Sequence, residues 1–196
     1  YQWQLSTAGA GGPWTNVANG GVYSGATTGS LVITAATAAM SGYQYRCVVD
    51  GTCAPAATTT NAALIVNSPI NITTQPNANT NICATGSTSF TVAVTGTSPT
   101  YQWQESTNGG STWTNVTNGG IYLGATTNTL NLTGITATMN SYRYRNVITG
   151  AAPCVSVISN NAVLNVTPQP VISIAPLTAL SAGQQTTLTV NVTPAP

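Results

Sequence analysis

The stretch Tyr101-Gln102-Trp103-Gln104 decides the fold, because it repeats Tyr1-Gln2-Trp3-Gln4 and most later motifs repeat with it. The offset stays close to 100 residues, so the chain is a tandem array of one domain type, and each unit has to be explained only once. The other recurring motifs are Trp-Thr-Asn-Val at Trp14 and Trp113, Gly-Ala-Thr-Thr at Gly25 and Gly124, Tyr-x-Tyr-Arg at Tyr43 and Tyr142, and Asn-Ala-x-Leu at Asn61 and Asn161.

The composition is low in charge but not that of a disordered chain. The 196 residues include three arginines, two acids, no lysine and no histidine, and charged residues make up 3%, against roughly 25% in ordinary globular proteins. Apolar residues reach 42% and are strongly patterned, whereas disordered chains combine few apolar residues with high charge. No apolar run approaches the ~18 residues of a membrane span, so we expect no membrane insertion.

This composition excludes several classes of function. Acid–base and nucleophilic catalysis need histidine, lysine or paired carboxylates, and the acids Asp50 and Glu105 lie in different repeats. Zinc needs Cys/His clusters and calcium needs several carboxylate oxygens. Three arginines cannot supply the phosphate contacts of a nucleic-acid binder. The sequence therefore predicts no enzyme, no metal, no cofactor and no nucleic-acid partner.

Short alternating runs between Gly, Pro and Asn turn signals predict an all-β fold of sandwich type. Phe90, Val92 and Val94 alternate with Thr91 and Ala93, the pattern of a strand with one buried face. Further inward-facing residues are expected at Tyr101, Trp103, Leu130, Leu132, Tyr142, Tyr144, Asn146, Ile148, Ala162, Leu164 and Val166.

The order of these motifs resembles a known family. A tryptophan on a third strand, an apolar strand before it and Tyr45-x-Cys47 on a sixth strand resemble an immunoglobulin-like Greek-key sandwich. The fuller pattern, from Tyr-Gln-Trp-Gln to Tyr-x-Tyr-Arg, looks like the immunoglobulin-like repeats of large secreted and cell-surface proteins of Bacteroidota. The resemblance covers almost the whole chain. It is specific for fold and much less so for function.

The resemblance implies a role for four aromatic residues. Trp3 and Trp103 take the place of the core tryptophan, and Tyr45 and Tyr144 take the tyrosine-corner position. The chain departs from antibody domains at both cysteine positions, because the second strand carries an apolar residue near Val92 and the sixth carries Asn146 in repeat two. An inter-sheet disulfide of the antibody kind is therefore not expected.

The four cysteines, Cys47, Cys53, Cys83 and Cys154, allow three pairings. In a sandwich Cys83, before the second strand, and Cys154, in the last connection, can lie at one end, so we favour a Cys83–Cys154 bridge. Cys47 and Cys53 flank a short stretch that suits a tight hairpin, which leaves them as the second pair. The alternative is that all four are reduced.

Five polar or aromatic residues, in three groups, invite a functional interpretation. Trp14 and Trp113 could be exposed platforms for stacking sugars, or could simply cover the sheet. Arg46 and Arg145 share an outward position, where a stem lying on the sheet is favoured over ligand binding. Glu105 replaces Leu5 and is expected to be a solvated strand end, with a nearby arginine as the alternative partner.

The two ends of the chain match each other. The repeat divides the chain into residues 1–67, which lack the first two strands, a complete domain at 68–167, and the first two strands of a following repeat at 168–196. The latter are expected at Val171–Ile174 and Thr186–Val192, where Leu188, Val190 and Val192 correspond to Phe90, Val92 and Val94.

Two arrangements account for these ends. The chain is a window cut from a continuous array, or separate subunits donate their last two strands to the next subunit. We favour the first, since a mature chain starting inside a strand is unusual. Both predict copies that follow one another head to tail.

The leading hypothesis is a non-catalytic repeat of an extracellular or cell-surface fibre, stalk or filament. Its nearly zero net charge removes the repulsion that keeps proteins apart. The alternative is an adhesin or carbohydrate-binding array that uses the exposed aromatic residues Trp14 and Trp113 to bind surface glycans.

Overall fold

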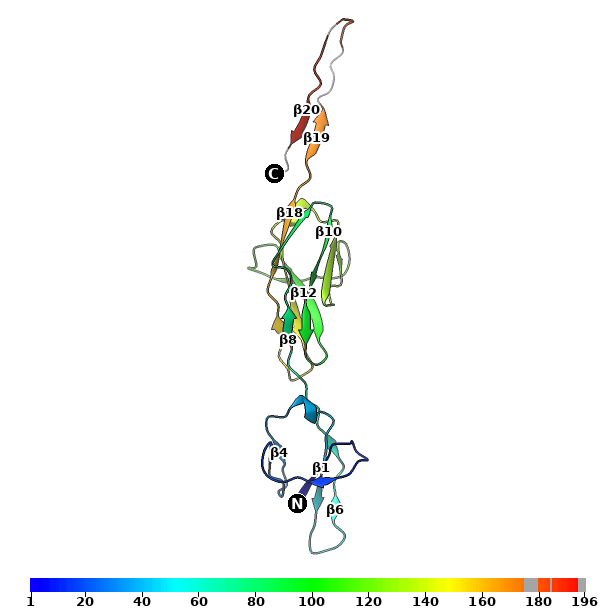
Figure 1. Cartoon of the computed structure of the whole chain (residues 1–196), viewed down its shortest axis with the longest axis vertical. Helices are drawn as coiled ribbons and strands as arrows, with labels where there is room; N and C mark the ends of the chain where they lie inside the picture. Colours follow the sequence, from blue (N-terminus) through cyan, green and yellow to red (C-terminus); the bar gives the residue numbers. More distant parts are fainter. Residues whose placement is uncertain (175–179, 184, 194–196) are drawn as a thin grey trace. The chain divides into compact units, whose positions relative to one another are not determined.

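The computed structural model describes residues 1–174, 180–183 and 185–193, and within them the predicted all-β fold of tandem sandwiches is confirmed (Figure 1). Residues 175–179, 184 and 194–196 of the expected third unit lie outside the described residues. The chain folds into two compact units. The first consists of residues 1–68 with Ala152–Cys154, and the second of residues 69–151 and 155–196.

The second unit is a complete sandwich of two layers. One layer has the strand order β13-β12-β16-β18-β9, with β17 also paired to β16, and the other is formed by β10-β15-β14 and the pair β11-β8. The bounds are β8 Asn71–Thr74, β9 Asn79–Cys83, β10 Ser87–Thr91, β11 Ala93–Thr95, β12 Thr100–Ser106, β13 Thr114–Asn115, β14 Tyr122–Leu123, β15 Thr129–Thr133, β16 Arg143–Thr149, β17 Val157–Ile158 and β18 Ala162–Thr167.

Alternation along these strands builds the core between the layers. On β12 the indole of Trp103 is fully buried while Gln102 and Gln104 face outward, as the period of two requires. Phe90 stacks on Tyr144 with ring centres 5.0 Å apart and tilts against Trp103 at 6.5 Å. The other members of this cluster are Val92, Val116, Ala125, Leu130, Leu132, Ile135, Met139, Ala162, Leu164 and Val166.

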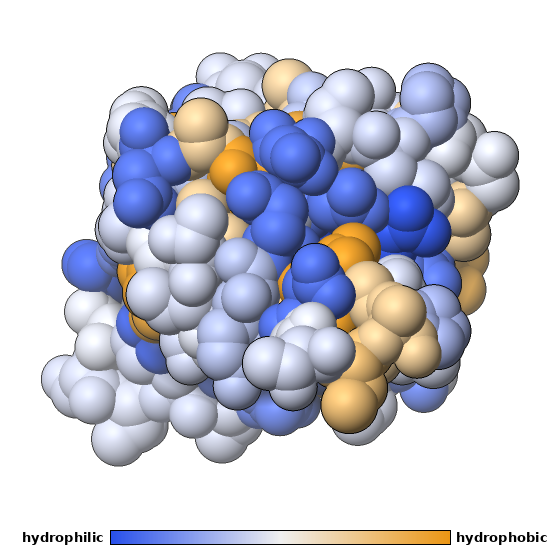
Figure 2. Space-filling view, turned by 90° about the horizontal axis from the view of Figure 1, so that it is seen from below, coloured by the Kyte–Doolittle hydropathy of each residue, from blue (hydrophilic) through white to orange (hydrophobic). Residues whose placement is uncertain are grey.

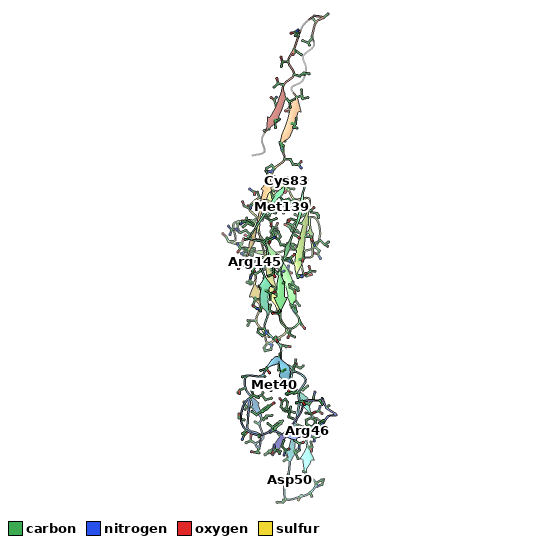
Figure 3. All side chains as sticks on the ribbon, in the orientation of Figure 1. Met40, Arg46, Asp50, Cys83, Met139 and Arg145 are labelled. Carbon is green, nitrogen blue, oxygen red and sulfur yellow. The ribbon has the colours of Figure 1, made fainter. Side chains whose placement is uncertain are left out.

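One pairing has no counterpart in the predicted strands. The segment after β8 forms β9, which runs parallel to β18, with Asn79 opposite Val163 and Cys83 opposite Thr167. The first strand of the sandwich is thus divided between the layers, since β8 pairs with β11 in the other one. Cys83 consequently lies at the end of the sandwich where β18 ends (Figure 3).

The first unit contains the same elements except those that correspond to β8–β11. Its five-stranded sheet has the order β2-β1-β5-β6 with β7 also on β5, and β3 pairs with β4. The bounds are β1 Gln2–Ser6, β2 Thr15–Asn16, β3 Tyr23–Ser24, β4 Val32–Ile33, β5 Gln44–Val49, β6 Ala57–Thr58 and β7 Ala62–Ala63. A 3₁₀ turn precedes β5 in this unit (Ala38–Met40), and its equivalent precedes β16 in the second (Ala137–Met139).

The repeated Gly-Ala-Thr-Thr motif has a backbone explanation. Gly124 adopts φ +86°, and a Cβ there would overlap the carbonyl oxygen of Thr129, so the position requires glycine. Ala125 follows almost fully buried, and its amide donates to Asn118 Oδ1 at 2.8 Å. The carbonyl of Thr127 then accepts the indole N–H of Trp103 at 2.9 Å. The motif is therefore the loop that anchors the core tryptophan.

The last strands form a separate hairpin of β19 (Val171–Ile174) and β20 (Val190–Thr193). Their side chains are all exposed. No helix in the described parts of the chain has the length and apolar character needed to cross a membrane.

Candidate functional site

The outward face of the sheet carries one polar arrangement that occurs in both units, which we call the outer ladder. In the second unit it consists of Trp113, Asn115, Gln104 and Arg145, which come from β13 and the residue before it, from β12 and from β16. Gln104 lies directly opposite both Asn115 and Arg145 in the strand register. The ladder therefore crosses three neighbouring strands.

Hydrogen bonds and one ring contact connect the ladder. Gln104 Nε2 donates to Asn115 Oδ1 at 2.9 Å, and Arg145 Nε donates to Gln104 Oε1, also at 2.9 Å. The Arg145 guanidinium carbon lies 4.1 Å from the ring centre of Trp113, within the range of a cation–π contact. The indole N–H of Trp113 donates to the carbonyl of Gly110 at 3.1 Å.

The first unit repeats this geometry almost unchanged. Gln4 Nε2 donates to Asn16 Oδ1 at 3.0 Å, Arg46 Nε donates to Gln4 Oε1 at 2.8 Å, and Arg46 lies 4.2 Å from the ring centre of Trp14. Both tryptophans are half-buried. Each of the two expected ligand platforms is thus in contact with an arginine guanidinium.

A second polar cluster, made of Glu105, Tyr122 and Tyr144, lies at the edge of the core in the second unit only. The Tyr122 hydroxyl donates to Glu105 Oε2 at 2.6 Å and lies 3.1 Å from the Tyr144 hydroxyl. Because the proton of Tyr122 is used toward Glu105, Tyr144 donates to Tyr122. The expectation of Glu105 as a solvated strand end, or as an arginine partner, is therefore corrected: it is half-buried and accepts from a tyrosine.

Burial perturbs the tyrosines of this cluster. Burial first, and then the hydrogen bonds to Glu105 and Tyr144, raise the pKa of Tyr122 well above its ordinary value. Burial also raises the pKa of Tyr144, although its hydrogen bond with Tyr122 acts in the opposite direction. In the first unit Leu5 replaces the carboxylate, and Tyr23 and Tyr45 bond directly at 3.0 Å. The cluster stabilises neutral hydroxyls rather than preparing a base.

The tryptophan and the tyrosine expected in each core are buried to different degrees in the two units. Trp103 and Tyr144 are fully buried, and Tyr45 is 5% exposed. Trp3 is only half-buried, although its indole N–H donates to Thr28 just as Trp103 does to Thr127. Trp3 is more exposed than Trp103 because the first unit has no described strand in the place that Phe90 and Val92 occupy in the second.

Neither expected disulfide is formed, since all four cysteines are free thiols. For Cys83 and Cys154 the fold itself is the reason. Cys83 pairs with Thr167, where the chain leaves the sandwich, whereas the Cys154 thiol lies 3.7 Å from the carbonyl of Asn67, before the sandwich begins. Cys154 also groups with the first unit in the division of the chain. The favoured Cys83–Cys154 bridge is therefore corrected.

The prediction of a tight hairpin between Cys47 and Cys53 was wrong. The hairpin between β5 and β6 closes at Val49 opposite Ala57, which leaves seven residues, 50–56, in the loop. Cys47 points into the core at 3% exposure, and Cys53 is exposed in that loop.

Within the described residues no group of three or more His, Cys, Asp or Glu side chains could hold a metal ion.

Comparison with known proteins supports the fold. Residues 72–168 match the model described as "Domain of unknown function (DUF8696)", and none of the curated proteins matches the sequence. The "I-band fragment I67-I69 from titin" is similar with a TM-score of 0.61 at 16% identity, covering 86% of this chain and 56% of that one. The "3Ig structure of titin domains I67-I69 E-to-A mutated variant" gives 0.61 at 15% identity, with 87% and 56% covered.

This chain spans a little over half the length of those two structures. At such low identity the similarity shows the fold and nothing of function. Together with the strand order of the second unit and its repetition in the first, it identifies the chain as a tandem of immunoglobulin-like β-sandwich repeats.

Proposed function

We propose that the protein is a non-catalytic structural repeat of an extracellular surface fibre, stalk or filament, in which copies of the sandwich follow one another head to tail. The observation that carries this proposal is the agreement between the two outer ladders. The Gln–Asn, Arg–Gln and Arg–Trp distances of the two units agree within 0.1 Å. The repeated motifs are used to hold the sheet together rather than to present reactive groups.

The surface chemistry supports a structural role outside the cell. The face seen in Figure 2 is mostly hydrophilic or neutral, with apolar residues in small separate patches. A net charge of +1 leaves little long-range repulsion between copies. Three arginines and no lysine also leave few sites for trypsin-like proteases.

A glycan-binding array or adhesin is the second candidate, favoured by the half-exposed indoles of Trp14 and Trp113 at equivalent places. In that arrangement the ring face opposite the arginine would stack on a sugar. Tryptophan fluorescence titrated with oligosaccharides distinguishes the two functions, because a change that disappears when Trp14→Ala and Trp113→Ala are combined would favour binding, and no change in the unaltered chain would favour the structural role. Trp103 is fully buried, so its indole is not expected to respond to added sugar.

Electron microscopy of the native material, combined with the intact mass of its subunit, tests the structural proposal. We expect unbranched fibres, built either from one long covalent array or from subunits of about the size of this chain, 19.9 kDa. Dispersed single particles in the native material would contradict the proposal.

A further inference from the structure

Two arginines lie on the outward face of the second unit with no acidic side chain beside them among the described residues. Arg143 and Arg145 are both on β16, and Tyr144 between them is fully buried, so both arginines point outward. Alternate residues of a strand have Cα atoms about 7 Å apart, and like charges on one face of a sheet repel each other. Glu105, the one acid in this unit, accepts from Tyr122 at the edge of the core and so faces inward. A bound anion would relieve the repulsion.

Arg145 is held by contacts that leave most of its donors free. Its Nε donates to Gln104, and its guanidinium carbon lies 4.1 Å from the ring centre of Trp113. Neither Nη nitrogen has a partner among the described residues, and these two atoms carry every N–H donor of the guanidinium except the one on Nε. A planar donor group that is already fixed loses little freedom when it binds an anion.

The guanidinium of Arg143 reaches the same indole from the next outward position. Arg143 Nη1 and Trp113 Cζ2 lie 3.6 and 3.7 Å from one point, the place that a Cβ on Gly110 would take. Within the described part of the chain this guanidinium makes no hydrogen bond or ion pair. Both guanidinium groups therefore lie beside one half-buried indole with their Nη donors unused.

The first unit shows that the outer ladder does not need Arg143. Gln44 stands at the equivalent position, and its Oε1 accepts from Asn61. Arg46 nevertheless makes the same ladder contacts as Arg145. The sheet is thus held with one arginine per unit, and the ladder leaves Arg143 unexplained.

The unused polar groups around this indole are donors. Gln104 Oε1 and Asn115 Oδ1 already accept, from Arg145 and from Gln104, whereas Asn115 Nδ2 has no partner in the described residues. A matching ligand therefore brings acceptors, with a negative charge for the arginines. A uronic acid has a carboxylate, which guanidinium groups bind in a bidentate manner, hydroxyl oxygens for the amide and an apolar ring face for the indole. An acidic peptide matches less well, because its backbone N–H groups are donors too.

We propose that Arg143, Arg145 and Trp113 form a binding site for an acidic sugar, a uronate residue of a polysaccharide. The carboxylate lies between the two guanidinium groups, the sugar ring packs on the exposed part of the indole, and Asn115 donates to a hydroxyl oxygen. This inference rests on glycan binding, the second function proposed above, and specifies the class of ligand. It is independent of the structural role.

Isothermal titration calorimetry of the full chain with trigalacturonate, at low ionic strength, tests the site. Arg143→Gln should weaken binding about tenfold or more, because it removes a charge-assisted hydrogen bond to the carboxylate. Glutamine is the residue of the first unit at this position, so the fold accepts it. The methyl ester of trigalacturonate, the same sugar without its charge, should bind at least tenfold more weakly than the acid.

Val155→Asp is the matched control. It changes the net charge as much as Arg143→Gln does, at an exposed residue outside the site, and should leave the affinity unchanged. Gln44→Arg is the converse variant, because it places a second guanidinium beside Arg46 and should add a second site to the chain. Circular dichroism checks that each variant is folded.

Several results would overturn the proposal: no binding of trigalacturonate, equal binding of its methyl ester or of triglutamate, or an equal loss of affinity in Arg143→Gln and Val155→Asp. Binding of neutral oligosaccharides through Trp14 and Trp113, without preference for the uronate, would remove this site and leave glycan binding in place. The failure of the site is thereby separable from the failure of the function on which it rests.

Discussion

The guanidinium carbon of Arg145 lies 4.1 Å from the ring centre of Trp113, and the same side chain donates to Gln104 from Nε at 2.9 Å. One arginine thereby joins an edge strand to the centre of the sheet. Arg46 does the same for Trp14 and Gln4 in the first unit. Two of the three arginines in the chain are used in this way, so the scarce charge is structural.

Removing this arginine should destabilise the second unit. Arg145→Ala loses the cation–π contact and the hydrogen bond to Gln104, and we expect the free energy of unfolding to fall by about 1–2 kcal/mol. Urea denaturation measures the change. Arg143→Ala is the matched control, because it removes the same charge from the same strand without a ring contact among the described residues. An equal loss in both variants would contradict this role for the Trp113 contact.

The hydrogen bond of Tyr122 to Glu105 should contribute more than its equivalent in the first unit. Tyr122→Phe leaves the half-buried carboxylate without its donor, so we expect a loss of about 1.5–3 kcal/mol, the range for hydrogen bonds to charged groups. Tyr23→Phe breaks only the bond between two neutral hydroxyls, and about 1 kcal/mol is expected. Urea denaturation measures the free energy of unfolding of both variants. An equal loss in Tyr23→Phe and Tyr122→Phe would refute the larger contribution of the Tyr122–Glu105 bond.

Stability should be independent of pH near neutrality and fall in alkali. The chain has no histidine, the side chain that ordinarily titrates between pH 5 and 8. The pKa values of Tyr122 and Tyr144 are raised in the folded chain, so folding favours their neutral forms. Their contribution is fully present below the ordinary tyrosine pKa of about 10 and is lost as pH rises through the folded values.

Urea midpoints measured from about pH 6 to 11 check this dependence. Tyr122→Phe should lose less stability between pH 9 and 11 than the unaltered chain does, since one of the three tyrosines whose pKa is raised, Tyr45, Tyr122 and Tyr144, is then gone. A midpoint that changed markedly between pH 6 and 8 would contradict the account.

Asn146 is a site where a substitution should stabilise the fold. Its side chain is fully buried, and no partner for Oδ1 exists among the described residues. The first unit has Cys47 at this position, with the same backbone bond to a hydroxyl, Thr59 in place of Ser159. Asn146→Cys removes the unsatisfied carbonyl, and Thr127 still accepts from Trp103.

We therefore expect Asn146→Cys to raise the free energy of unfolding by about 1 kcal/mol, at the low end of the cost of an unsatisfied buried group. Thermal and urea unfolding under reducing conditions measure it. A fall of similar size would show that the 3.3 Å contact from Asn146 Nδ2 to Thr127 outweighs the unsatisfied oxygen.

The sequence predicted the layers and the inward faces well, because those depend on alternation within single strands. Leu130 and Leu132 on β15 and Ala162, Leu164 and Val166 on β18 are buried as their spacing indicates. The parallel pairing of β9 with β18 was missed. Asn79 and its partner Val163 are 84 residues apart, and the polar residues of β9 carry no strong strand signal.

The outer ladder was missed for a related reason. Alternation indicates only that Gln104 and Arg145 face outward, and it does not show that register brings them together. The repeats did contain a signal, since Trp, Asn, Gln and Arg recur in the same order at nearly the same offset, 99 residues for Trp, Asn and Arg and 100 for Gln. The prediction of a Cys83–Cys154 bridge failed for a similar reason. Whether two loops lie at the same end of a sandwich depends on the direction of the strands that they join, and alternation within single strands does not show that direction.

The central claim is that the protein is a structural repeat of an extracellular fibre, stalk or filament. Electron microscopy of the native material, together with the intact mass of its subunit, tests this claim most directly. We predict unbranched fibres in which copies of the sandwich follow one another. Dispersed single particles in the native material would contradict the claim.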